Sequence, residues 1–227
     1  MKRTASILCI AFFMFSAISV MAQYPSVTFF GGANMASTDM KFGETDTDLE
    51  DSFKPLYGMN IGALYEYVLD KDRSQEIAVE GGLLFETKGY HQKLEEENYH
   101  HNNKTTLYFV DVPVYLKYIY RFRSLNKVYV GAGGFAGAGL FGNESITFQF
   151  NGAESTSSSE TVAWGSEGDY KRLDYGVSGK VGFLMHNGLN ICVSYDYGLA
   201  DIAQIETQEA KTRTLRLSLG YTMKFDD

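Results

Sequence analysis

The feature that most constrains this chain is a two-residue alternation of apolar and polar side chains, which returns along almost its whole length. Residues 213–225 read RTLRLSLGYTMKF. Leucine, tyrosine, methionine and phenylalanine occupy every odd position from Leu215 to Phe225, whereas Thr, Arg, Ser, Gly and Lys occupy the even positions. A period of two predicts a β-strand with one apolar and one polar face.

The same alternation returns in other segments of the chain. Two glycine-rich segments, 24–36 and 128–142, show it more weakly. We therefore predict eight strands, at about 24–36, 57–67, 77–88, 105–120, 128–142, 173–185, 189–200 and 213–225.

The connections between these segments alternate in length. The long ones are 37–52, 92–103, 143–172 and 201–210, and the short ones are 70–75, 121–126 and 186–188. In an up-and-down barrel, successive connections lie at opposite ends, so all long loops share one end, as in outer-membrane proteins. The pattern predicts an all-β fold, an eight-stranded antiparallel up-and-down transmembrane β-barrel.

The composition of the polar parity indicates which face meets the surroundings. A water-bathed surface carries dense charge of both signs, whereas these positions are mostly Gly, Ser, Thr, Asn and Ala. We expect the polar face to line the interior, where an unpaired buried charge costs several kcal/mol. The apolar face, with tyrosines near the strand ends, then contacts outer-membrane lipid. Six acids and five bases would form an interior ion-pair network: Glu66, Glu80, Glu86, Lys88, Asp111, Lys117, Asp174, Lys180, Asp196, Arg216 and Lys224.

The N-terminus has the order of a secretory signal peptide. Lys2 and Arg3 precede an apolar run from Ile7 to Val20, and a small residue, Ala22, follows. We predict a signal peptide at 1–22 and a barrel domain at 23–227. The mature chain keeps 18 basic against 28 acidic residues, which argues against nucleic acid as a partner. Cys192 is then its only cysteine, so no intrachain disulfide can form.

Candidate chemical sites are sparse. His91, His100 and His101 share one loop, but their spacing matches no closed zinc pattern. The acids at 39–51 lack the order of a calcium loop. Neither His91 nor His186 has a suitably placed serine and carboxylate for nucleophilic catalysis. We predict no metal, no cofactor and no enzymatic activity.

The connection 143–172 exceeds ordinary loop lengths, which is typical of functional or disordered segments. It contains ESTSSSE and the only tryptophan of the chain. We hypothesise that Trp164 with Tyr170 forms a contact surface for an extracellular partner.

The segments DVPVYLKYIY, EGGLLFETKGY, FKPLYGMNIGALYEY, LDYGVSGKVGF and GLNICVSYDYGLADI, with the closing RTLRLSLGYTMKF, resemble the PorT-like outer-membrane β-barrel domain family over residues 24–225. The resemblance implies an eight-stranded barrel similar to the small OmpA and OmpX barrels; one named member of the family serves secretion and maturation. Two features depart from expectation. Asp226 and Asp227 follow the terminal aromatic Phe225, and Pro113 lies within a strand, where we expect a bulge or a frayed pair.

Three functions are compatible with these observations. The first is a structural or adhesive barrel of the bacterial outer membrane, with a plugged interior and extracellular loops. The second is a PorT-like accessory of protein secretion that docks an envelope protein. The third is a soluble exported barrel that carries a lipid. For the first two we expect a monomer.

Overall fold

The computed structural model describes residues 25–42, 53–96, 99–150, 156–165, 168, 170–204 and 208–225. The predicted signal peptide, 1–22, lies outside these residues. Nowhere in the described ranges is there a helix long and apolar enough to cross a membrane. The strands are β1 (Ser26–Phe42), β2 (Phe53–Lys71), β3 (Gln75–Glu96), β4 (Tyr99–Arg121), β5 (Lys127–Phe150), β6 (Thr156–Thr161), β7 (Leu173–Leu184), β8 (Leu189–Gly198) and β9 (Gln208–Lys224).

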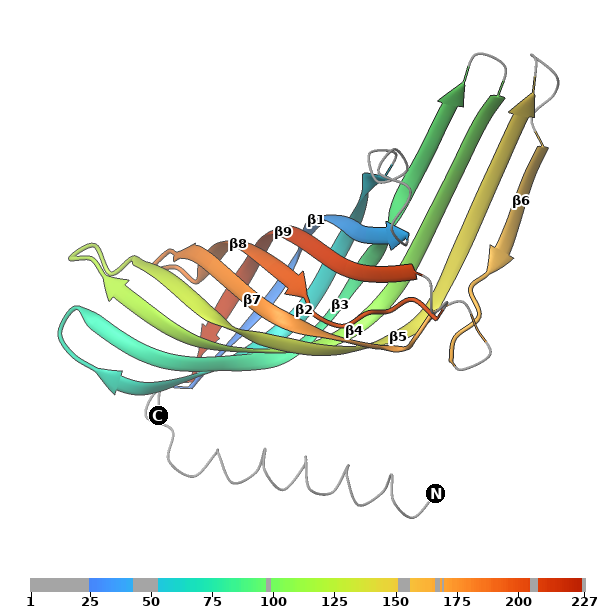
Figure 1. The fold of residues 1–227 in the computed structure, drawn as a ribbon. Coiled ribbons are helices and arrows are strands. Elements are labelled where there is room, and N and C mark those ends of the chain that lie inside the picture. Colours follow the sequence, from blue (N-terminus) through green and yellow to red (C-terminus); the bar gives the residue numbers. More distant parts are fainter. Residues whose placement is uncertain are drawn as a thin grey trace.

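Eight of these strands close into a ring (Figure 1). Each pairs antiparallel with its neighbours, in the order β4, β3, β2, β1, β9, β8, β7, β5, and β4 pairs with β5 to complete the circle. The closing contact between the ends of the chain, β1 with β9, runs without a register shift from Ser26↔Lys224 to Phe42↔Gln208. Closure satisfies the backbone groups of each strand inside the sheet, which a membrane requires. The predicted eight-stranded up-and-down barrel is confirmed.

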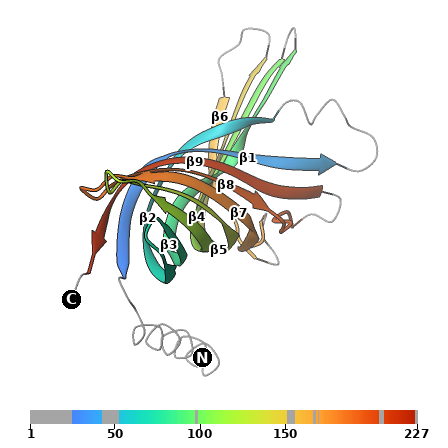
Figure 2. The ribbon, with the colours of Figure 1, turned by 90° about the vertical axis from the view of Figure 1, so that its left-hand side faces the viewer.

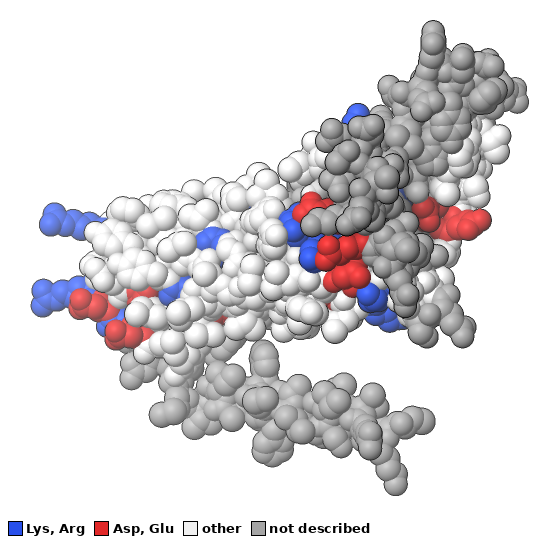
Figure 3. Space-filling view, viewed as in Figure 1, with Lys and Arg blue, Asp and Glu red and all other residues white. Residues whose placement is uncertain are grey.

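The apolar parity faces outward. Leu215, Leu217 and Leu219 are 40%, 58% and 56% exposed, whereas Arg216 between them is 2% exposed. Figure 3 shows the consequence: charged side chains gather toward the two ends of the barrel, and the band between them is largely uncharged. The predicted orientation is confirmed. A soluble lipid carrier would need the opposite one, so that alternative is excluded.

The two ends of the barrel differ, as the connection lengths predict. The short turns after β2, β4 and β7 lie at one end, here named the turn end, together with the start of β1 and the end of β9. The turn after β7 is tight: Gly188 has φ 93° and its N–H donates to the Met185 carbonyl at 3.0 Å. The other end, here named the loop end, carries the long connections.

The strands near the loop end run further than the sequence pattern predicts. The segments 92–103 and 143–172 are expected to be loops, yet β3 and β4 continue to Glu96 and from Tyr99, and β5 continues to Phe150. The short strand β6 then pairs with this outer part of β5. Figures 1 and 2 show β3 to β6 rising as a sheet above one side of the ring.

Polar cross-strand contacts stabilise this extension. Asn103 donates to Glu144 at 2.6 Å, and the hydroxyls of Thr147 and Ser157 lie 3.2 Å apart. Because such a sheet carries polar residues on both faces, its sequence lacks the apolar alternation that marks a strand. That is why these residues read as loops.

Pro113 lies where the sequence predicts a local disturbance. On the β3 side the pairing passes from Gly81↔Val114 to Leu84↔Asp111 without a shift, so Val112 and Pro113 are skipped. Proline has no N–H to donate to the ladder. The pairing between β3 and β4 is therefore frayed at Val112 and Pro113, and the register of the two strands is the same on both sides of this gap.

Candidate functional site

The barrel interior holds most of the predicted charged residues. The side chains come from six strands of the ring and converge because their parity points inward. Ten of the eleven predicted residues are at most 8% exposed: Glu66, Glu80, Glu86, Lys88, Asp111, Lys117, Asp174, Lys180, Asp196 and Arg216.

Four of them form a cluster nearer the turn end, the turn-side cluster: Glu66, Glu80, Lys117 and Lys180. Lys117 binds Glu66 and also Glu80, at 2.6 Å, and Lys180 binds the other oxygen of Glu80. Aromatic rings face both ammonium groups, since the Lys117 Nζ lies 4.1 Å from the ring centre of Tyr129 and the Lys180 Nζ 4.6 Å from that of Tyr115. Two carboxylates oppose two ammonium groups, so this cluster is neutral.

The other six form the loop-side cluster: Glu86, Lys88, Asp111, Asp174, Asp196 and Arg216. Lys88 lies at its centre, with Nζ 2.9 Å from Asp111, 2.8 Å from Asp174 and 3.4 Å from Glu86. Aromatic faces flank it, because the ring centres of Phe109 and Phe135 lie 4.8 Å and 4.6 Å from the same nitrogen. One ammonium group therefore serves three carboxylates.

Arg216 organises the other half of the loop-side cluster. Its Nη1 and Nη2 donate to the two oxygens of Asp196 at 2.7 Å and 2.6 Å, a bidentate pair. The Nη1 also donates to Glu86 at 2.7 Å, and Nε donates to the Ser194 hydroxyl at 2.9 Å. Glu86 therefore contacts both Arg216 and Lys88 and links the ion pairs of these two cations.

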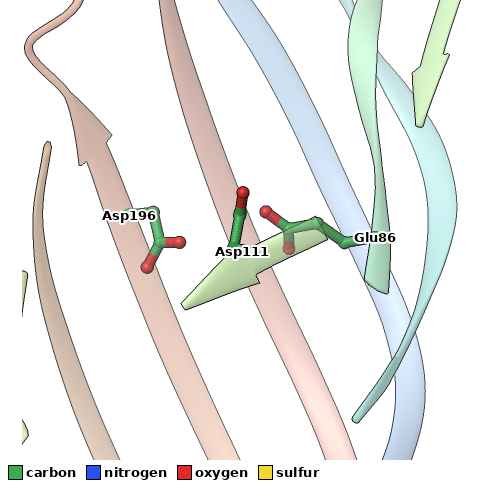
Figure 4. Close-up of side chains that lie close together, drawn as sticks. All are labelled: Glu86, Asp111 and Asp196. Atoms are coloured by element: carbon green, nitrogen blue, oxygen red, sulfur yellow. The ribbon is translucent and has the colours of Figure 1, made fainter. Parts of the chain in front are cut away.

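Negative charge is in surplus in the loop-side cluster, where four carboxylates face two cations. Glu86, Asp111 and Asp196 bring oxygen atoms within 4.8 Å of one another (Figure 4). That spacing is compatible with a metal ion, but Lys88 and Arg216 already bind these carboxylates. Asp111 Oδ1 and Asp174 Oδ1 have no hydrogen-bond partner in the described part of the chain. The two aspartates that pair with Lys88 are therefore only partly satisfied by hydrogen bonds.

Lys224 departs from the prediction. It is exposed at the end of β9 and lines a hollow at the turn end instead of the interior. The physical reason is its place at the strand terminus, where inward parity leads into the open mouth of the barrel. The interior therefore contains six predicted acids against four bases, not against five.

Sequence reasoning missed an ion-pair group beside Lys224. Glu76 is 2% exposed and binds both Arg121 and Lys127, the latter at 2.5 Å. The sequence does indicate an inward side chain at this position, because Glu76 shares the even parity of Glu80 and Glu86 on the same strand. The expected strand began at residue 77 and so left it out.

Trp164 and Tyr170 are adjacent, as the hypothesis requires, but they do not form an exposed surface. Tyr170 is 7% exposed, and its hydroxyl lies 3.0 Å from that of Tyr90. Trp164 packs edge-on against Phe109, with ring centres 5.7 Å apart. The chain after β6 turns back onto the barrel, so these rings bury apolar area over its loop end. The predicted contact surface is corrected to an aromatic cap, defined here as Tyr90, Phe109, Trp164 and Tyr170.

Asp201 anchors the last connection beside this cap. Its Oδ1 accepts the N–H groups of Ala203 at 3.0 Å and Ala210 at 2.9 Å, and Lys171 binds Oδ2 at 3.1 Å. Burial by itself would raise the pKa of Asp201, but these hydrogen bonds outweigh it and hold the pKa below its usual value.

The histidines do not assemble into a metal site in the described residues. His91 Nε2 lies 2.5 Å from Asn102 Oδ1, and His186 is in the turn after β7, at the opposite end. The side chains of His100 and His101 lie outside the described part, as do residues 43–51 of the acidic loop.

A closed ring with lipid-facing apolar parity and interior ion pairs is the architecture of an outer-membrane barrel. Residues 21–204 match the outer membrane protein beta-barrel domain family. The chain belongs to this family. The outer membrane is therefore its location, whereas PorT-like identity remains a resemblance.

Solved structures of three other proteins resemble this chain. Ail, the attachment invasion locus protein of Yersinia pestis, is 19% identical, with 89% of this chain and 100% of that chain covered and a TM-score of 0.35. Neisserial surface protein A is 16% identical, covering 87% and 97%, with a TM-score of 0.35. OprG from Pseudomonas aeruginosa is 11% identical, covering 89% and 97%, with a TM-score of 0.38. No curated protein matches the chain.

Proposed function

We propose that this protein is a structural and adhesive outer-membrane barrel, closed to passage, that presents its extended loop-end sheet to an extracellular partner. The observation that carries the proposal is the open edge of β6. All six residues of β6 are exposed, and among the described residues it pairs with β5 alone.

An open edge of this kind can accept a strand from another chain. Its unpaired N–H and C=O groups offer a ladder of main-chain hydrogen bonds, a common mode of peptide recognition. Soluble proteins usually protect such edges with lysine or proline, but β6 reads TSSSET, with Glu160 as its only charge. We therefore infer that the edge is left available for binding.

The contents of the barrel interior also support this proposal. The two ion-pair clusters occupy the barrel, and the aromatic cap covers the loop end. A barrel filled in this way would not transport solutes, so its function would depend on its outer surface. The expectation that the chain is not an enzyme stays a prediction.

The experiment is an attachment assay with bacteria that express the chain, on surfaces coated with serum proteins. Replacing Ser157 and Ser159 with Lys places repelling, solvated charges on the edge and should reduce attachment severalfold. The matched control introduces the same residue at Asn187, in the turn after β7. Unchanged attachment with the β6 variant, at equal surface expression, would refute the adhesive function.

The resemblance to the PorT-like family supports a second candidate, an accessory of protein secretion. Its turns would then dock a periplasmic or membrane neighbour, and the exposed basic residues at the turn end, among them Lys224, favour an acidic one. Mild crosslinking followed by a pull-down distinguishes the two functions. A secretion accessory retrieves other envelope machinery through the turn end, whereas an adhesive barrel is crosslinked through β6.

A further inference from the structure

A hollow of about 290 Å³ opens at the turn end of the barrel. Its walls come from the ends of β1, β2 and β9, the start of β3, the turns after β4 and β7, and the interior next to them. We call it the turn-end vestibule. The charged residues that line it are Glu66, Lys71, Glu76, Arg121, Lys127 and Lys224.

The vestibule is basic, although the whole chain carries a net charge of −8. Four cationic side chains line it against Glu76. The other acid in its wall, Glu66, is bound to Lys117 of the neutral turn-side cluster. With both acids counted, the four cations exceed the negative charges of the wall by two.

The geometry of Glu76 leaves donors available. One oxygen of this buried carboxylate binds Arg121 and the other binds Lys127. An arginine has five N–H donors and a lysine has three, so a single carboxylate leaves most of them unused. The side chains of Arg121 and Lys127 are 27% and 10% exposed, and both face the hollow. Glu76 thus holds two cations in fixed positions along one wall.

The apolar part of the wall would strengthen hydrogen bonds between a bound anion and the cations of the vestibule. Val68, Leu125 and Leu184 contribute apolar surface to the same hollow. Charged hydrogen bonds are stronger where neighbouring apolar groups exclude water. The volume lies at the small end of the range for ligand pockets, so the hollow suits a compact ligand.

We propose that the turn-end vestibule binds a phosphate group. A phosphate group carries one negative charge as a diester and up to two as the free anion. In both forms it offers several acceptor oxygens, which suit the planar guanidinium of Arg121 and the ammonium groups of the lysines. The group is carried either by a free phosphate anion or by the headgroup of a phospholipid, whose acyl chains stay outside the hollow. This inference is independent of the adhesive function, since the two sites lie at opposite ends of the barrel.

The test uses the refolded mature chain in a zwitterionic detergent that contains no phosphate. Isothermal titration with inorganic phosphate and, separately, with short-chain phosphatidylglycerol measures the two sources. Saturable binding of either ligand supports the proposal and identifies the source. The absence of saturable binding for both overturns it.

Two variants make the assignment specific. Lys224→Gln, an exposed change that breaks no buried pair, should weaken binding about threefold. Glu76→Gln should strengthen binding, because the amide still offers an acceptor oxygen to Arg121 and Lys127 while the negative charge that repels phosphate is removed. A purely structural role of Glu76 would instead give a less stable barrel with no gain in affinity, which overturns the proposal.

The matched control is Arg73→Gln, which removes one positive charge from the turn after β2 without touching the lining of the hollow. It should leave the affinity unchanged. If it weakens binding as much as Lys224→Gln does, the attraction is non-specific and the vestibule is not a site.

Discussion

At the scale of single residues, the interior charges differ in how completely they are neutralised. The turn-side cluster pairs two acids with two bases, while the loop-side cluster sets four acids against two. Asp196 is fully engaged by the Arg216 fork, whereas Asp111 keeps Oδ1 without a hydrogen-bond partner among the described residues. The two carboxylates should therefore respond differently to neutralisation.

Asp111→Asn removes one surplus negative charge while Lys88 keeps Asp174 and Glu86. We expect the free energy of unfolding to stay the same or rise by about 1–2 kcal/mol. Asp196→Asn breaks a bidentate buried pair and should lower it by about 3 kcal/mol. Urea titration followed by the heat-modifiable gel shift measures both. Equal losses in the two variants would contradict the charge surplus.

Arg216→Leu removes the cation that binds both Glu86 and Asp196. Leaving two buried carboxylates unpaired should cost about 3–5 kcal/mol. The control is Lys171→Leu, which breaks an exposed pair with Asp201 and should cost no more than about 1 kcal/mol. An unchanged melting point for Arg216→Leu would argue against an essential interior ion pair.

Asp201 makes the last connection sensitive to acid. Its pKa is lower when folded than the ordinary value of 3.8. Its contribution to stability is therefore complete above that value and is lost as the pH falls through the folded pKa. Trp164, the only tryptophan, is a probe of this region, because Tyr170 bridges it to Ala203. We expect an acid transition in its fluorescence below about pH 4 that Asp201→Asn abolishes; persistence of the transition in that variant would exclude Asp201 as its source.

At the scale of elements, the extension of β3 to β6 is separable from the ring. The ring closes through β4 with β5 and β5 with β7, and β6 contributes to neither contact. The strand alternation predicts the ring strands well, because each buries one face. The side chains of the extension whose burial is described form no buried face, so its strands could not be recognised from apolar periodicity.

Deleting residues 153–160 removes most of β6 and should leave barrel folding intact. The expected melting point and heat-modifiable shift equal those of the full mature chain, because no ring pairing is lost. Attachment in the assay described above should fall with the same deletion. Failure of the shortened chain to insert would show instead that the segment is needed for the fold.

At the scale of the whole molecule, eight strands enclose a space just wide enough for side chains. The two charge clusters lie in this space between apolar groups at either end: the aromatic cap, and a turn-end group formed by Ala78, Ile119, Tyr129 and Leu184. Salt bridges that tie six strands together would have to open before ions could pass. This arrangement is the basis for the proposed closed interior.

We therefore expect small or no conductance from the reconstituted protein. Single-channel recording in planar bilayers measures it, with the Arg216→Leu variant for comparison. Sustained large currents from the unmodified chain would refute the closed interior and favour a pore.

Local alternation along the sequence was sufficient to predict the strands of the ring, their orientation and ten of the eleven inward charges. Side-chain direction in a strand follows from backbone geometry alone, so Leu217 and Arg216 could be assigned to opposite faces without knowing any neighbour. The alternating lengths of the connections likewise predicted the two ends of the barrel.

Pairing among the charges depended on register and on the stagger of the closed ring, which are properties of the whole sheet. Arg216 meets Glu86 across 130 positions of sequence, and no local pattern joins them. The same holds for the exposure of Lys224 at the open mouth and for the burial of Tyr170 within the aromatic cap. Parity tells which way a side chain points, but only the assembled barrel decides what it meets there.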